Sequence, residues 1–165
     1  AYDYVKDEIE EIRDSIDGKV LKVIIETCLL TDEEIIKATE ICNDCYVNFI
    51  KTSTGFDKGG ATLDAVKLIN EHKSELVEIK ASGGIRDYKT AVEFIEAGAT
   101  RIGTSSGIKI MEEEKNEILN RVQNVLKKYT NYSKVIVVTH GIVITTLTGV
   151  YKPHCAQIVK YDFKN

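Results

Sequence analysis

The chain has 165 residues, enough for one domain with a sizeable core, and its hydrophobic and charged fractions of 43% and 29% are ordinary for a globular protein. No apolar run approaches the roughly 18 residues that span a bilayer, and the N-terminus lacks a signal-peptide pattern, so we expect a soluble, cytoplasmic protein without a membrane partner. A net charge of -4 without a basic stripe argues against nucleic acid as a partner. Any anion site must therefore be local.

Four cysteines are candidate metal ligands: Cys28, Cys42, Cys45 and Cys155. Cys42 and Cys45 form a C-x-x-C motif late in a predicted helix, but no second pair lies at the spacing of a zinc site. We therefore predict neither a metal nor a cofactor. The cysteines are interpreted as small core residues of a protein in a reducing compartment.

A strand and a helix follow an amphipathic helix predicted over residues 2–17. Residues 20–26 form an apolar run broken only by Lys22, which predicts a strand covered on both faces. Thr31 then opens a helix and has Glu34 three positions later, the pattern of a capping box. This completes a first β-then-α unit.

The same unit repeats along the first two thirds of the chain. Further strands are predicted over residues 46–52, 76–81 and 101–104, each followed by a loop that contains glycine. Strand starts lie about 24 to 30 residues apart, which is the period of consecutive right-handed βαβ crossovers. This part of the chain should therefore form a parallel sheet.

The motifs change beyond residue 107. A charged run leads into another amphipathic helix, and residues 135–139 form a predicted fifth strand that ends at His140. Residues 156–161 form a predicted sixth strand. The change is one of motif rather than of composition.

Three lysines recur at an even step along the first three strands, Lys22, Lys51 and Lys80. Ligands of a parallel α/β sheet bind at the carboxyl ends of its strands, where these lysines and Ser105 are expected to lie. If Lys51 and Lys80 lie about 6 Å apart at an effective dielectric near 20, their repulsion is roughly 2.8 kcal/mol, or about two pK units. One amine would then be partly neutral at about pH 7 to 8, as a Schiff-base nucleophile requires. The alternative is that the lysines extend into solvent and pair with nearby carboxylates.

Two turns are suited to binding phosphate. Ser82-Gly83-Gly84 and Thr104-Ser105-Ser106-Gly107 are each expected to join a strand to a helix N-terminus, where free N–H groups and the helix dipole attract an anion. Glycine lets the backbone approach closely, and serine hydroxyls add donors. Barrel enzymes often hold phosphate on their last two loops, which strengthens the interpretation.

Five motifs in about the first 110 residues resemble the second half of deoxyribose-phosphate aldolase. They are Lys22-Val23-Ile24-Ile25-Glu26-Thr27, Phe49-Ile50-Lys51-Thr52-Ser53-Thr54-Gly55-Phe56, Gly59-Gly60-Ala61-Thr62, Ile79-Lys80-Ala81-Ser82-Gly83-Gly84-Ile85-Arg86 and Arg101-Ile102-Gly103-Thr104-Ser105-Ser106-Gly107. The resemblance implies a TIM-barrel class I aldolase that joins acetaldehyde and glyceraldehyde 3-phosphate through a lysine Schiff base.

The resemblance also implies roles for single residues. It makes Lys51 the Schiff-base lysine, Lys80 the neighbour that lowers its pKa, and Lys22 an additional active-site cation. The residues expected to hold the substrate phosphate are Gly55, Gly83, Gly84, Ser105 and Ser106. In the family, four further βα units with a catalytic aspartate come before the first helix of this chain, and nothing in this sequence corresponds to them. Loss of such an acid/base group typically costs about 10²- to 10⁴-fold in rate, so impaired turnover is expected.

The last 50 or so residues resemble a different family. The motif Val135-Ile136-Val137-Val138-Thr139-His140-Gly141 and the strand that ends near Phe163 are similar to the C-terminal part of histidine phosphatases of the phosphoglycerate-mutase type. This resemblance makes His140 a phosphate-pocket residue. The family's N-terminal Arg-His-Gly motif has no counterpart here, so phosphatase activity is not expected.

Together these features predict a single α/β domain over residues 1–165 of chimeric character, aldolase-like over 1–110 and histidine-phosphatase-like over 111–165. We expect three layers around a mainly parallel sheet of about six strands, half a TIM barrel extended by two strands, of which the last could be antiparallel. The alternative is a half-barrel that pairs with a second copy as a homodimer. The predicted function is an aldolase-like lyase acting on a small phosphorylated aldehyde or sugar. The alternative is an engineered or recombined scaffold that binds inorganic phosphate or sulfate without turnover.

Overall fold

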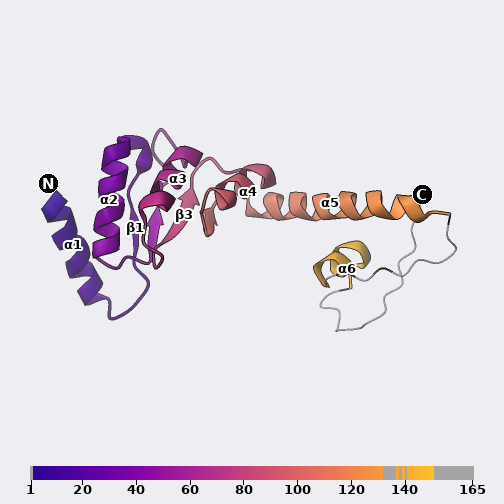
Figure 1. Ribbon diagram of the computed structural model, residues 1–165, viewed down its shortest axis with the longest axis horizontal. Helices are drawn as coiled ribbons and strands as arrows, with labels where there is room; N and C mark the ends of the chain where they lie inside the picture. Colours follow the sequence, from indigo (N-terminus) through magenta and orange to yellow (C-terminus); the bar gives the residue numbers. More distant parts are fainter. Residues whose placement is uncertain (1, 132–136, 138, 140, 151–165) are drawn as a thin grey trace. The chain divides into compact units, whose positions relative to one another are not determined.

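Four short parallel strands form a sheet whose order follows the chain, β1-β2-β3-β4. Figure 1 labels β1 and β3 among the helices α1 to α4. The computed structural model describes residues 2–131, 137, 139 and 141–150. Its helices and strands, with η for a 3-10 helix, are α1 (Tyr2–Ser15), β1 (Lys22–Ile24), η1 (Thr27–Leu29), α2 (Asp32–Asp44), β2 (Phe49–Lys51), α3 (Leu63–His72), β3 (Glu78–Ser82), α4 (Tyr88–Glu96), β4 (Arg101–Gly103), α5 (Gly107–Leu126), η2 (Lys127–Tyr129) and α6 (Gly141–Thr148). The parallel sheet with helical crossovers is thereby confirmed.

The sheet has four strands in the described part of the chain, rather than the six that were predicted. The predicted sixth strand, residues 156–161, lies outside the described residues, as does most of the predicted fifth strand, residues 135–139. Within the latter, Val137 and Thr139 are described and belong to no strand. No helix among the described residues is both long and apolar enough to cross a membrane.

The chain divides into two compact units, residues 1–109 and 110–165. The first unit holds the whole sheet together with α1 to α4. The second unit holds α6 and most of α5.

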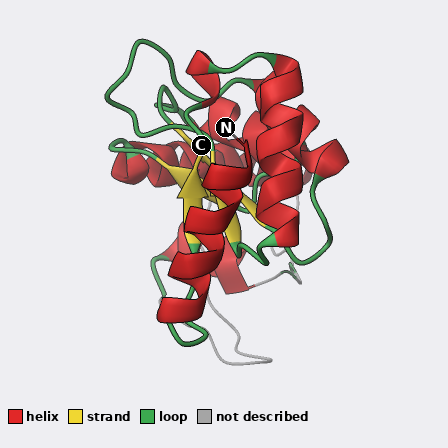
Figure 2. Cartoon of the chain, turned by 90° about the vertical axis from the view of Figure 1, so that its left-hand side faces the viewer, coloured by secondary structure: helices red, strands yellow, loops and turns green. Residues whose placement is uncertain are grey.

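The sheet of the first unit has an apolar face and a polar face. Ile50 of β2 and Ile79 of β3 are fully buried and share the core with Ile69 of α3. Burial of side chains of this size stabilises the fold by about 1.5 to 3 kcal/mol each. Side chains alternate between the two faces of a strand, so Lys51 and Lys80, the next residues in sequence, lie on the opposite face. Figure 2 shows the short strands in yellow among the red helices.

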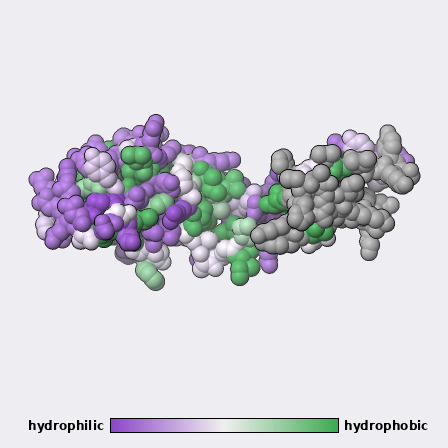
Figure 3. Space-filling view, turned by 90° about the horizontal axis from the view of Figure 1, so that it is seen from below, coloured by the Kyte–Doolittle hydropathy of each residue, from purple (hydrophilic) through white to green (hydrophobic). Residues whose placement is uncertain are grey.

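The first helix is attached to the rest of the unit by one apolar and several polar contacts. Ile9 is buried, and Lys6 Nζ donates to the Asp44 carboxylate at 3.0 Å. Arg13 donates to Asn48 Oδ1 at 3.0 Å and to two backbone carbonyls before β1 and β2. The surface of the first unit over α1 and α2 is mainly hydrophilic, at the left of Figure 3.

Local signals for the second helix are confirmed. The Thr31 hydroxyl accepts from Glu34 N–H and the Glu34 carboxylate accepts from Thr31 N–H, so the predicted capping box is present at the start of α2. Strand β1 differs from the expectation that it is covered on both faces. It is an edge strand in which Lys22 is exposed and Ile24 is 44% exposed.

Three of the four cysteines lie in described residues, and they are free thiols. Cys42 and Cys45 are buried, as predicted for core residues, whereas Cys28 is exposed and Cys155 lies outside the described residues. Burial raises the pKa of Cys42 to about 12 and also raises the pKa of Cys45, so neither is a ready thiolate. No group of three potential ligand side chains is placed to hold a metal ion in the part of the chain that the structure describes.

Candidate active site

A cleft of about 360 Å³ opens where β2, β3 and β4 end. It is lined by the ends of these strands and by the loops that follow them: Lys51, Thr54, Gly55, Lys80, Ser82, Gly83, Gly84, Ile85, Arg86, Gly103, Thr104 and Ser105. We call it the lysine cleft. Parallel α/β sheets bind ligands at this edge, so the lysine cleft is the candidate site.

Lys51 and Lys80 lie side by side in the lysine cleft. They are register partners on adjacent parallel strands, about 4.8 Å apart along the sheet, so both project from the polar face. Lys51 is the last residue of β2, as predicted. Lys22, in contrast, is the first residue of β1 and pairs with Phe49. It therefore lies at the amino end of its strand instead of the predicted carboxyl end.

Desolvation and the positive charges nearby lower the pKa of Lys80 below its ordinary value. Desolvation is the largest cause, followed by the charges of Lys22, Lys51 and Arg101, all of which disfavour the ammonium form. The Arg101 guanidinium lies 3.9 Å from the centre of the Phe49 ring, so it reaches from β4 across β3 toward β2. Lys80 is therefore neutral to a larger extent at a given pH than a solvated lysine.

The turn after β3 brings two glycines into the left-handed region of the backbone. Gly83 has φ 90° and Gly84 has φ 82°, values that side chains strongly disfavour. The loop before α3 packs against this turn: a side chain on Gly60 would overlap the Gly83 carbonyl, and Ala61 N–H donates to Ser82 O at 2.9 Å. Successive backbone N–H groups in such turns form concave sites for anions.

The helices that follow the two glycine-containing turns differ at their N-termini. Asp87 caps α4, because its carboxylate accepts from Thr90 N–H at 2.8 Å and from the Thr90 hydroxyl at 3.0 Å. The N-terminus of α4 is thus already occupied by a carboxylate, which the sequence did not predict. Helix α5 begins at Gly107, directly after Ser105 and Ser106, and has no acidic residue in its first turn. Its N-terminus is the better place for a phosphate.

Polar contacts hold the loops of the lysine cleft in place. The buried Thr52 hydroxyl donates to Ser82 O at 3.2 Å and accepts from Ser82 N–H at 3.1 Å, which ties the end of β2 to the end of β3. Glu26 has a left-handed backbone, φ 51°, and its carboxylate accepts from Thr54 N–H at 3.0 and 3.2 Å. These contacts pre-organise the site before any ligand arrives.

Six of the nine predicted site residues line the lysine cleft: Lys51, Lys80, Gly55, Gly83, Gly84 and Ser105. Lys22 and Ser106 are not part of its lining, and His140 lies outside the described residues. These six are half of the twelve lining residues, and the sequence pattern places one lysine at the wrong end of its strand.

Two of the other lining residues, Ser82 and Gly103, have no role assigned to their side chains from the sequence, although Ser82 belongs to one of the two turns predicted to bind phosphate. They are register partners on β3 and β4, and each follows a cation on the same face by two positions, Lys80 and Arg101 respectively. Side chains two positions apart on a strand point to the same face, so this spacing from a strand cation is the sequence signal by which both residues could be predicted.

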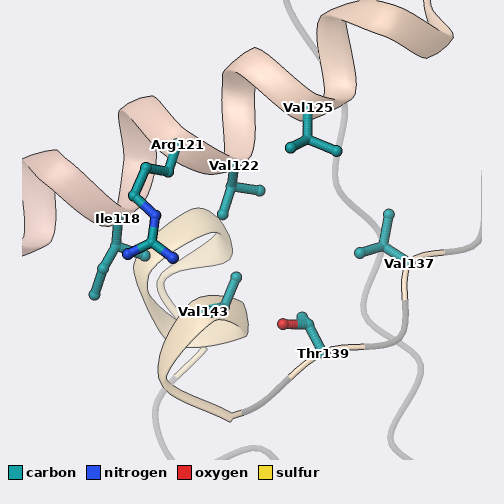
Figure 4. A pocket seen from close by; sticks show the side chains of 7 residues that line it. All are labelled: Ile118, Arg121, Val122, Val125, Val137, Thr139 and Val143. Carbon is teal, nitrogen blue, oxygen red and sulfur yellow. The ribbon is translucent and has the colours of Figure 1, made fainter.

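A second cavity, of about 260 Å³, lies in the second unit (Figure 4). Its lining comes from α5, from α6 and from the segment before α6: Ile118, Arg121, Val122, Val125, Val137, Thr139 and Val143. This lining is mainly aliphatic, and its one charged residue, Arg121, pairs with Glu117 at 3.9 Å. The described lining contains no lysine, histidine or carboxylate.

Comparisons with known proteins identify relatives of the first two thirds of the chain. No family model matches the chain. A deoxyribose-phosphate aldolase of Clostridium tetani is 60% identical over 115 residues, which are 69% of this chain and 53% of that protein. The enzyme of the same name from Finegoldia magna is 57% identical over 111 residues, 67% of this chain and 52% of that protein. The chain thus spans about half the length of the curated relatives it matches.

Solved structures show the same relationship. The aldolase QR15 has a TM-score of 0.67 and 52% identity, over 72% of this chain and 53% of that one. The deoxyribose phosphate aldolase of Aeropyrum pernix has a TM-score of 0.64 and 33% identity, over 70% of this chain and 50% of that one. None of these relatives supports the predicted histidine-phosphatase resemblance of residues 116–165 or the predicted chimera. The chain is homologous to deoxyribose-phosphate aldolases over about two thirds of its length.

Proposed function

We propose that this chain is an aldolase-like lyase in which Lys51 forms a Schiff base with a small phosphorylated aldehyde or sugar. The observation that carries the proposal is the pairing of Lys51 with Lys80 in a cleft that also contains the glycine turn Gly83-Gly84. Homology to deoxyribose-phosphate aldolases supports the reaction class. Because the chain spans about half of those relatives, turnover by this chain is itself part of the proposal.

Schiff-base formation uses the two neighbouring amines. The neutral Lys51 amine attacks the carbonyl carbon, and the new C–N bond gives a carbinolamine. The neutral Lys80 amine accepts one proton from the Lys51 nitrogen and passes it to the former carbonyl oxygen, which completes the carbinolamine. Lys80 then takes a second proton from solvent and donates it to this hydroxyl, which leaves as water while the C–N bond becomes the protonated imine. The lowered pKa of Lys80 suits it to this exchange, because proton transfer is most effective when the pKa lies near the working pH. Lys22 adds a positive charge to this environment.

The phosphate of the substrate binds at the far end of the cleft. Backbone N–H groups of the turn at Gly83 and Gly84 and the Ser105 hydroxyl supply donors, and the N-terminus of α5 supplies a favourable field. Gly55 and Ser106 complete the proposed phosphate site. Inorganic phosphate or sulfate should therefore compete with a phosphorylated aldehyde.

Borohydride trapping tests the Schiff base. The protein is incubated with acetaldehyde and borohydride, and peptide mass spectrometry locates the reduced adduct. We expect the adduct on Lys51 and its loss in Lys51→Arg, because the guanidinium stays protonated and does not form an imine. Lys89→Arg is the matched control, since Lys89 on α4 is 88% exposed and lies outside the cleft lining. An adduct spread evenly over surface lysines, or one that survives Lys51→Arg, contradicts the proposal.

Assembly with a second copy is a further part of the proposal. Lys51 and Lys80 on the polar face of the sheet are half-buried, and the related aldolase of Aeropyrum pernix is tetrameric. A second copy that covers this face would complete a closed layer around the lysines. Light scattering should then give twice the mass of 18.5 kDa, and a stable monomer would rule out pairing.

A further inference from the structure

The Ser82 hydroxyl is a buried polar group without a partner. Ser82 ends β3, is 4% exposed and lines the lysine cleft. No described residue forms a hydrogen bond with its Oγ. Buried hydroxyls are normally satisfied, so an unpaired one beside a cleft points to a partner that arrives from outside.

The backbone of Ser82 is fixed by three hydrogen bonds. Its N–H donates to Thr52 Oγ1 at 3.1 Å, and its carbonyl accepts from Thr52 Oγ1 at 3.2 Å and from Ala61 N–H at 2.9 Å. The neighbouring loops therefore use the main-chain groups and leave the hydroxyl unused. A hydroxyl on such a fixed backbone is pre-organised to bind a ligand.

Gly103 shows where the hydroxyl points. A Cβ atom on Gly103 would overlap Ser82 Oγ and would lie 2.9 Å from Lys80 Cε. The Ser82 hydroxyl and the Lys80 side chain thus extend over the same glycine into one space. Along the chain, Ser82 follows Lys80 by two positions on β3 and comes directly before Gly83 and Gly84 of the proposed phosphate site, and all four residues line the cleft.

We infer that Ser82 Oγ binds a hydroxyl group on the carbon chain of the phosphorylated aldehyde, next to the carbon that bears the phosphate. The order of groups along β3 and the turn after it carries this inference: the Lys80 amine, then the unpaired Ser82 hydroxyl, then the glycine turn. A substrate with its carbonyl at Lys51 and its phosphate at Gly83-Gly84 places that hydroxyl beside Ser82. The inference rests on the proposed function, and it makes Ser82 a residue that selects hydroxylated over plain aldehyde phosphates.

The test compares two ligands in the full chain and in Ser82→Ala. Glyceraldehyde 3-phosphate carries the hydroxyl and 3-oxopropyl phosphate lacks it, and NMR titration gives the dissociation constant of each. Loss of one neutral hydrogen bond should weaken binding of glyceraldehyde 3-phosphate about 3- to 10-fold in Ser82→Ala. Binding of 3-oxopropyl phosphate should change by less than about twofold, because it has no hydroxyl to lose.

The control is Ser53→Ala, which removes another fully buried hydroxyl, one that donates to Thr52 Oγ1 at 3.3 Å. It should leave the ratio of the two dissociation constants unchanged. If Ser82→Ala does not fold, Ser82→Cys keeps the size of the side chain with a much weaker donor, and the same loss of preference is expected.

The outcomes separate this inference from the proposed function. An unchanged ligand preference in Ser82→Ala overturns the inference, even if Lys51 forms an imine with acetaldehyde. A Ser82-dependent preference without an adduct on Lys51 supports the inference as a binding site and rejects the Schiff-base chemistry. Failure to bind either ligand, without an adduct, overturns both.

Discussion

Replacing Arg101 by methionine should raise the pKa of Lys80. The Arg101 guanidinium crosses β3 to reach the Phe49 ring, and its charge is one of the causes that lower this pKa. Methionine keeps much of the side-chain length and removes the charge. The ammonium form of Lys80 then meets less repulsion, so the lysine should hold its proton to higher pH.

The size of the effect follows from Coulomb's law. Arg101 and Lys80 are register partners, and two such side chains place their charges about 7 Å apart. The repulsion at this distance is roughly 0.6 kcal/mol in bulk water and roughly 2.4 kcal/mol at an effective dielectric of 20. Arg101 is exposed, so the lower part of this range applies. We expect the pKa of Lys80 to rise by an amount that corresponds to this lower part of the range of repulsion energies.

Side-chain NMR of isotopically labelled lysine measures this shift directly, by titration of the Lys80 resonance. Arg101→Lys preserves the positive charge and should keep most of the effect, whereas Lys89→Met on α4 should cause no shift. The other charged groups on the same sheet face, Lys22, Lys51 and Glu78, stay in place in each variant. If a folded Arg101→Met protein shows the wild-type titration of Lys80, the charge of Arg101 does not reach the amine and the electrostatic account of the site is wrong.

Two predictions concern stability. Gly60→Ala should lower the free energy of unfolding by about 1 to 3 kcal/mol, because the new Cβ meets the backbone of Gly83. Gly107→Ala is the control: its new Cβ has nothing within 4 Å, so it should be nearly neutral in the same urea titration. Equal effects of the two substitutions would contradict the close packing of the Gly60 and Gly83 loops. Asp87→Ala should lower the urea midpoint at neutral pH, since it removes the cap on Thr90 N–H. The hydrogen bonds from Thr90 hold the pKa of Asp87 below its ordinary 3.8. The stability that they contribute is therefore present above pH 3.8 and is lost as the pH falls through the lowered pKa. The difference in urea midpoint between wild type and Asp87→Ala should accordingly disappear in acid.

The features that were predictable from the sequence depend on neighbours in the chain. The capping box at Thr31 and Glu34 needs only a spacing of three, and it forms as expected. The pairing of Lys51 with Lys80 follows from the even repeat of the βα units, which puts equivalent positions of successive strands in register. Features of this kind can be predicted from the sequence because they depend on the local geometry of the chain.

Features that depend on distant parts of the chain could not be predicted in the same way. Lys22 lies within an apolar run that continues to Ile25, but hydrogen bonds to β2 make β1 only Lys22–Ile24, so the lysine begins the strand. Exposure of Ile24 reflects the edge position of β1, which strand spacing does not reveal. The close approach of Gly60 to Gly83 joins loops that are far apart in sequence, so no local pattern signals it.

The period of two along the strands separates the residues that fold this unit from those that act in its site. On β3, Ile79 and Ala81 are fully buried against the helices, while Lys80 and Ser82 line the lysine cleft. A shift of the register by one residue would exchange the two sets and bury the lysine in the core, at a large cost for an unpaired charge. The apolar packing of one face therefore fixes where the amines and the hydroxyl of the other face stand. Gly103 completes the arrangement from β4, because any larger residue would fill the space into which Lys80 and Ser82 extend.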